Sequence, residues 1–116
     1  IDACASIAVI GSYLYLNAKF VADSEQDYTF YVNGDEVTPE ISYEGGKVYY
    51  LLKGPYMSPL DYDKPVTFTV ELNGVCENYV TSALEYVQAA LDQIPSLASV
   101  FNAIVKYHYS AKVYND

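Results

Sequence analysis

The spacing of apolar residues changes near residue 77, and this change divides the chain into two parts. Upstream, the segment 66–72 (Val-Thr-Phe-Thr-Val-Glu-Leu) alternates strictly between apolar and polar residues. A period of two predicts a strand with one buried and one solvated face. Downstream, the apolar residues from Val80 to Ile94 recur at the i, i+3, i+4, i+7 spacing of a helix. The chain is therefore expected to consist of strands followed by helices.

Turns containing glycine and asparagine separate short strand-like runs in the first part. Asn33-Gly34 and Asn73-Gly74 match the type I′ hairpin turn, whose two central residues have positive φ, and Gly45-Gly46 indicates a further hairpin. Pro39 follows the first turn and indicates an edge strand, because proline cannot donate to the hydrogen-bond ladder. Short strands with turn signals about every eight to twelve residues predict a sandwich or a barrel, and of these we expect a mainly antiparallel β-sandwich of the immunoglobulin-like kind.

The helical spacing predicts two helices, so the fold as a whole is expected to be α+β. The first helix should begin after an N-cap at Asn78 and end at Pro95, and the second should run from about Leu97 to Val113. The short link 94–96 predicts an antiparallel helical hairpin that covers part of the sheet. Residues 1–76 would form the sandwich and residues 77–116 the hairpin, in one domain.

The charge of the chain excludes two classes of partner. Its 116 residues include six Lys, no Arg and 15 Asp or Glu, which gives a net charge of −9. Nucleic acid requires a positive binding surface, and an anionic membrane surface would repel the chain. No run of about 18 apolar residues is present, so membrane insertion is not expected. The chain begins with Ile-Asp and shows no basic segment ahead of a cleavage site, which we interpret as an excised domain or a mature form.

The two cysteines, Cys4 and Cys76, allow two interpretations. In the first, they form one disulfide, which would contribute about 4 kcal/mol for a loop of this length and would favour an oxidising, extracellular setting. Alternatively, they are two buried free thiols that pack as small apolar side chains. The spacing leaves both interpretations open. Two cysteines and a distant histidine do not make a zinc site.

Tyrosine is the most over-represented residue, with 14 copies in a chain that has no Trp. An exposed tyrosine offers a flat apolar face and a polar tip to a sugar or a protein. The alternative is ordinary strand composition, because tyrosine suits half-buried pleated surfaces. If the tyrosines near the loop 54–65 are exposed on one patch, they favour carbohydrate binding. These candidate ligand-binding residues are Tyr49, Tyr50, Tyr56 and Tyr62.

Two acidic loops are candidates for a calcium site, because hard cations bind several carboxylate and carbonyl oxygens. Neither loop matches the EF-hand pattern, and the alternative is that both loops are simply solvated. The candidate ligands are Asp23, Glu25 and Asp27 in one loop and Asp61 and Asp63 in the other. No other cofactor is expected.

Catalytic motifs are absent from the sequence, so enzymatic activity is not expected. There is no G-x-S-x-G nucleophile turn and no H-E-x-x-H metal motif. The single histidine, His108, follows Ile104 by four residues on the apolar stripe of the second helix, where a packed histidine is expected. Paired carboxylates would suit a small hydrolase, but any acidic domain contains such pairs by chance.

Several segments resemble a module of secreted and surface proteins of gut Firmicutes, in which a small β-sandwich precedes a helical hairpin. The segments that carry the resemblance are 37–39 (Val-Thr-Pro), 65–70 (Pro-Val-Thr-Phe-Thr-Val), 78–80 (Asn-Tyr-Val), 97–98 (Leu-Ala), 103–107 (Ala-Ile-Val-Lys-Tyr) and 111–114 (Ala-Lys-Val-Tyr). The chain departs from the pattern at His108, where a glycine is common, and has no Phe after Tyr114. These are packing positions and carry no catalytic residues.

The resemblance implies an extracellular or cell-surface module of a larger bacterial protein. We therefore expect a non-catalytic structural or partner-binding unit whose partners are neighbouring domains or another protein. The alternatives are a carbohydrate-binding module that uses exposed tyrosines and, less favoured by the sequence, a small hydrolase.

Overall fold

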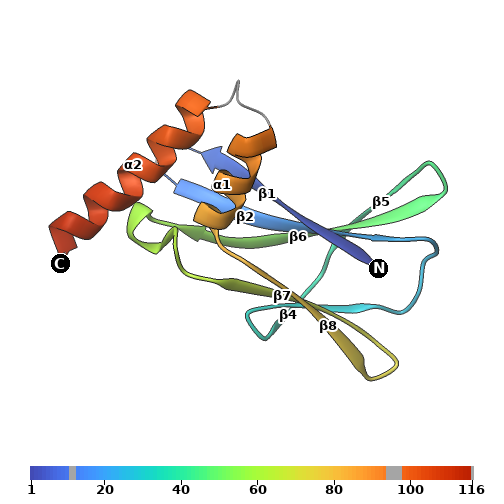
Figure 1. Cartoon of the computed structure of the whole chain (residues 1–116). Helices are drawn as coiled ribbons and strands as arrows, with labels where there is room; N and C mark the ends of the chain where they lie inside the picture. Colours follow the sequence, from blue (N-terminus) through green and yellow to red (C-terminus); the bar gives the residue numbers. More distant parts are fainter. Residues whose placement is uncertain (11–12, 94–97, 116) are drawn as a thin grey trace.

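A computed structural model describes residues 1–10, 13–93 and 98–115. Within these residues, eight strands form two sheets and two α-helices follow them. Figure 1 shows how the sheets and the helices are arranged. Every strand pair in both sheets is antiparallel. The predicted α+β class and the order of strands before helices are therefore confirmed.

The first sheet has the strand order β1-β2-β6-β5. Its strands are β1 (Asp2–Ile10), β2 (Tyr13–Ala22), β5 (Glu40–Glu44) and β6 (Lys47–Met57). Strand β6 continues five residues beyond Leu52 and includes part of the segment predicted to be a loop. This extension determines which tyrosine faces solvent.

The second sheet has the strand order β4-β3-β7-β8. Its strands are β3 (Thr29–Val32), β4 (Asp35–Val37), β7 (Val66–Leu72) and β8 (Val75–Thr81). Asn33 and Asn73 have φ of 51° and 52°, as the predicted type I′ turns require. Pro39 lies between β4 and β5, which are edge strands of different sheets, so its missing N–H costs no ladder bond.

One hydrophobic core contains side chains from both sheets. The ring of Phe30 on β3 lies 5.6 Å from that of Phe20 on β2 and 5.0 Å from that of Tyr50 on β6. Alternation along the strands supplies the buried set, because successive strand residues point to opposite faces. The buried members include Leu14, Leu16, Ala18, Phe20, Phe30, Val48, Tyr50, Leu52, Val66, Phe68 and Val70.

Helix α1 (Ala83–Gln93) begins later than the sequence predicted. Strand β8 continues to Thr81, past the boundary expected at residue 76, and Ser82 caps the helix by accepting the Glu85 N–H at 3.1 Å. Asn78 lies in β8, where its side chain accepts a 2.7 Å hydrogen bond from Thr69, so its predicted role as N-cap is wrong. The predicted link at 94–96 lies outside the described residues.

Helix α2 (Ala98–Asn115) packs against the 3₁₀ turn η1 (Pro59–Asp61) through His108. This imidazole is only 1% exposed, and its Nδ1 donates to the Pro59 carbonyl over 2.6 Å. Nearby, the Asp63 carboxylate binds Lys112 of α2 at 2.6 Å. The prediction of a packed helical histidine is therefore confirmed, and His108 anchors the last helix to the loop after β6.

Candidate functional site

The four tyrosines proposed as ligand-binding residues do not form one patch. Tyr50 and Tyr62 are 2% and 4% exposed and belong to the core, so the expectation that they are exposed on one patch is wrong. Tyr49 is half-buried, with the Lys19 ammonium 5.5 Å from its ring centroid. Tyr56 is 62% exposed. Of the four candidates, Tyr56 alone has its ring mainly in solvent.

Tyr56 faces solvent because β6 contains a bulge. Lys53 pairs with Asn17 and Tyr56 pairs with Tyr15, so Gly54 and Pro55 together oppose one residue of β2. A bulge of this kind shifts the alternation of the strand by one residue. Without the bulge, residue 56 would face the core, as the even-numbered residues 48, 50 and 52 of the same strand do. With it, Met57 takes the buried position and Tyr56 points outward.

Gly54 is required at the bulge by close contact between backbones. A Cβ at this position would lie 1.8 Å from the backbone oxygen of Leu16 and 3.2 Å from the ring of Phe68. The Gly54 N–H donates to the side-chain oxygen of Asn17 at 3.2 Å, which replaces a ladder bond lost at the irregularity. Pro55 has no N–H to satisfy, so the second bulge position suits it.

The bulge places Tyr56 beside two tyrosines of β2, and we call these three side chains the tyrosine face. Tyr15 lies directly across from Tyr56 in the strand register, with ring centroids 6.0 Å apart and planes inclined at 55°. Tyr13 meets Tyr56 edge to face at 5.2 Å and 85°. Such cross-strand aromatic contacts favour these ring orientations. The tyrosine face is thus a preformed aromatic corner on the outer side of the first sheet.

A hollow of about 310 Å³ adjoins the tyrosine face, and its size is at the lower end of the range for small-ligand sites. Ala8 and Ile10 of β1 and Tyr15 of β2 provide its apolar lining, and Asn17 and Lys53 provide polar groups. The Asn17 oxygen is bonded to Gly54, so its amide nitrogen is the group left to donate to a ligand.

The Lys53 ammonium is held in an exposed ion pair with Glu40 at 3.0 Å. Exposed pairs of this kind contribute about 0–1 kcal/mol, so a ligand oxygen can compete for the ammonium at little cost. The hollow therefore combines an apolar wall, an aromatic edge and two hydrogen-bond donors.

Sequence reasoning missed Tyr13 and Tyr15, although a signal for them was present. Along β2, the tyrosines at 13 and 15 alternate with the leucines at 14 and 16, which are both buried. This alternation places both tyrosines on the outer face. The Gly54-Pro55 pair was the corresponding signal for the bulge, because both residues are typical of interrupted strands.

The acidic residues of the first loop have separate partners. Asp23 accepts a 2.7 Å bond from Lys47, and this bond lowers the pKa of Asp23 below its ordinary value. Glu25 accepts a 2.9 Å bond from the Tyr43 hydroxyl, which raises the pKa of that tyrosine. Asp27 is exposed. The loop thus uses two of its three carboxylates to bind the β5–β6 hairpin.

The acidic residues of the second loop also have partners on the chain. Lys64 binds Asp61 at 2.7 Å, and this contact lowers the pKa of Asp61. Lys112 binds Asp63, and this hydrogen bond lowers the pKa of Asp63 below its ordinary value. Among the described residues, no group of three or more His, Cys, Asp or Glu side chains is arranged to hold a metal. The calcium site stays a prediction.

The thiols of Cys4 and Cys76 are free and exposed, so the structure contains no bridge between them and the alternative of two buried thiols is wrong. Cys4 lies opposite Lys19 in the first sheet, and Cys76 lies opposite Glu71 in the second. The Cys76 sulfur is 3.9 Å from the Glu71 carboxylate. A bridge between strands β1 and β8 would require both side chains to turn from these positions.

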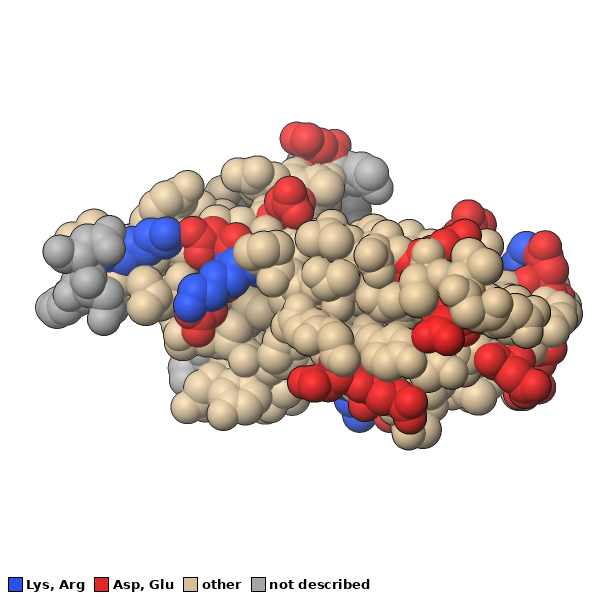
Figure 2. Space-filling model, turned by 90° about the horizontal axis from the view of Figure 1, so that it is seen from below, with Lys and Arg blue, Asp and Glu red and all other residues tan. Residues whose placement is uncertain are grey.

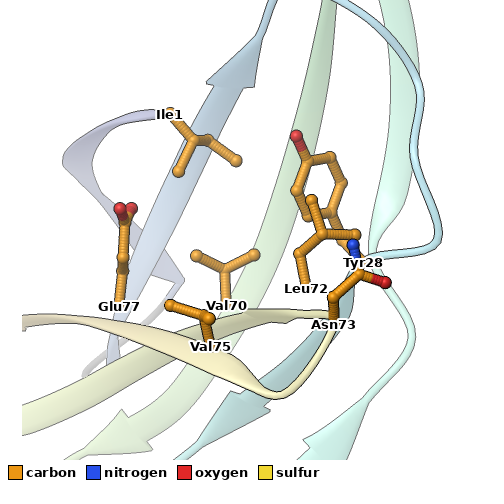
Figure 3. A pocket seen from close by; sticks show the side chains of 7 residues that line it. All are labelled: Ile1, Tyr28, Val70, Leu72, Asn73, Val75 and Glu77. Atoms are coloured by element: carbon orange, nitrogen blue, oxygen red, sulfur yellow. The ribbon is translucent and has the colours of Figure 1, made fainter.

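A second hollow, of about 370 Å³, lies at the end of the β7–β8 hairpin. In Figure 3, Val70 and Val75 lie at its centre, while Glu77 and Tyr28 stand on opposite sides. Glu77 occupies an inward position of β8, since it pairs with the buried Val70. An inward-pointing charge on an edge strand disfavours the addition of another strand. This hollow also has no exposed pair of rings, so it is the weaker candidate for a ligand.

Acidic side chains outnumber basic ones in this chain, which carries a net charge of −9. Figure 2 shows one face, where Asp and Glu side chains recur along the molecule while Lys side chains occur at few positions. By contrast, the residues that line the hollow beside the tyrosine face include a lysine and no carboxylate. The candidate site therefore differs in charge from its surroundings.

Comparisons with protein-family models, curated proteins and solved structures found no match to this chain. Neither of the two described helices has the length and apolar character needed to cross a membrane. The likeness to the Firmicutes module thus stays a prediction from the sequence.

Proposed function

We propose that this chain is a non-catalytic binding module of a larger extracellular protein, and that its tyrosine face binds carbohydrate. One observation carries the proposal: the Gly54-Pro55 bulge turns Tyr56 out of the core and against Tyr13 and Tyr15, beside a hollow with two donors. Aromatic rings pack against the apolar C–H face of a sugar, while amide and ammonium donors bind its hydroxyls.

The strand arrangement supports the immunoglobulin-like part of the proposal. The orders β1-β2-β6-β5 and β4-β3-β7-β8 correspond to the two sheets of such sandwiches, with one extra edge strand on the second sheet. The two helices, proposed as a hairpin, would cover the end of this sandwich. Folds of this kind serve many functions, so the argument for binding rests on the site and not on the fold.

The placement outside a bacterial cell rests on the sequence resemblance and is part of the same proposal. A structural role, in which the tyrosine face contacts a neighbouring domain, is the competing function. The two hydrogen-bond donors of the hollow favour a ligand with many hydroxyls over the surface of a neighbouring domain. Each donor that is covered needs an acceptor, and a sugar offers several.

Binding to a broad glycan array, with and without calcium, tests the proposal. A specific sugar should bind the native chain, and Tyr56→Ala should weaken that binding by about two- to twelvefold, because stacking on one ring contributes about 0.5–1.5 kcal/mol. Dependence on calcium would support the predicted cation site in the acidic loops.

Tyr107→Ala is the matched control, because Tyr107 is 61% exposed on α2 and lies outside the tyrosine face. It should leave glycan binding unchanged. If no glycan binds, or if Tyr107→Ala weakens binding as much as Tyr56→Ala, the tyrosine face is not a sugar site, and contact with another protein becomes the favoured function.

A further inference from the structure

Strand β1 is an edge strand without charged residues along nearly its whole length. Among the described strands, only β2 pairs with it, so its other side presents unpaired backbone groups. After Asp2 the sequence has no charged residue until Lys19. Val9 and Ile10 near its end are 54% and 65% exposed. A long, uncharged, apolar edge is a template for pairing with another strand.

The other three edge strands carry carboxylates that discourage such pairing. Strand β4 contains Asp35 and Glu36, β5 has Glu40 and Glu44 at its ends, and Glu77 points inward from β8. Charges on or beneath an edge are a common protection against unwanted strand addition. Among the described edge strands, β1 is the one whose only carboxylate, Asp2, lies at one end and leaves residues 3–10 without a charge, although helix α1 contacts this strand.

The charge of the chain indicates which partner suits this edge. A basic partner would be attracted to the acidic edges β4 and β5. A second copy, also at −9, would be repelled there and would meet no carboxylate along the middle of β1. The uncharged edge is therefore the place where two acidic copies can approach.

We propose that two copies pair antiparallel through β1, about a two-fold axis at Ser6, and join their first sheets into one. This register uses all nine residues of the strand. The residue numbers of each pair differ by an even number, so side chains that face the core in one copy lie beside side chains that face the core in the other. Among the inward-facing residues, Ala5 then lies opposite Ile7 of the partner and Ala3 lies opposite Val9, so each large side chain there meets a small one. The two Asp2 residues lie at opposite ends, away from each other.

The joined sheet would present both tyrosine faces on one surface, one on each side of the axis. A ligand with repeating units could then engage two sites at once and gain affinity without any new contact. The pairing itself depends only on the β1 edge and is independent of carbohydrate binding.

Light scattering after size exclusion tests the assembly, and it should give twice the chain mass of 12.9 kDa. Ser6→Lys should weaken the dimer by about tenfold or more, because it places two like charges directly opposite each other. Ser6 is exposed, so the monomer should stay folded. Ser42→Lys on the exposed edge strand β5 is the matched control and should not change the mass.

A disulfide trap tests the register. Residues opposite each other in an antiparallel pair have Cα atoms about 4.5–5.5 Å apart, within the range of a disulfide. With Cys4→Ser and Cys76→Ser as background, Ser6→Cys should cross-link into dimers under mild oxidation, and Ser42→Cys should not. A monomeric mass at high concentration, or equal cross-linking at positions 6 and 42, would overturn the proposal and leave the β1 edge to a different partner.

Discussion

Replacement of Gly54 by alanine perturbs the one position on which the candidate site depends. The new Cβ would lie 1.8 Å from the Leu16 backbone oxygen, so the β2 and β6 backbones must separate by more than an ångström. Such overpacking costs about 1–3 kcal/mol, and the strained hydrogen bond from Gly54 to Asn17 costs about 1 kcal/mol more. We expect Gly54→Ala to lower the free energy of unfolding by about 2–4 kcal/mol.

Urea unfolding followed by tyrosine fluorescence measures this change, because the chain contains 14 Tyr and no Trp. Gly45→Ala is the control: its φ of 59° is strained for alanine, but nothing lies within 4 Å of the added Cβ. It should cost about 1 kcal/mol. If Gly54→Ala costs no more than Gly45→Ala, the close approach at the bulge is absent, and the argument for the outward position of Tyr56 fails.

Three further predictions concern the last helix and the thiols. His108→Ala should lower the free energy of unfolding by about 2–4 kcal/mol in urea, because it removes a buried side chain and leaves the Pro59 carbonyl without its donor. The Asp63 pKa is lowered mainly by the hydrogen bond from Lys112, so this carboxylate stabilises the fold fully above the ordinary value of 3.8 and loses its effect as the pH falls below it. Melting temperatures measured from about pH 6 to about pH 2 should therefore fall less steeply for Asp63→Asn than for the native chain. Alkylation without reductant should add two labels to the folded chain, at Cys4 and Cys76, whereas an unlabelled mass would show that they form a disulfide.

The parts of the fold that depend on local sequence were predictable. Strand β7 has the bounds that its alternation indicated, and the Asn-Gly turns have the positive φ that their residues favour. The start of α1 was not predictable from local signals, because Asn78 and Ser82 both suit an N-cap. Pairing of Asn78 with Thr69 across the sheet decided between them.

The candidate site was only partly predictable, for a related reason. Tyr56 was identified as a candidate, but alternation along β6 would have placed it inside, together with Tyr50. Its outward position follows from a bulge whose partner, Leu16, is distant in sequence. Tyr62 was selected for its place in a proline-rich loop, but His108 from the last helix stacks on its ring at 6.2 Å and covers it. Both outcomes depend on contacts between distant segments.

The most direct test of the proposed function is an NMR titration of the chain, labelled in its tyrosine rings, with a glycan that binds on the array. The account predicts that the signals of Tyr13, Tyr15 and Tyr56 shift in proportion to the bound fraction, while those of Tyr43 and Tyr107 stay in place. Shifts confined to tyrosines outside the tyrosine face would contradict it, because the sugar would then bind a surface that the bulge does not create.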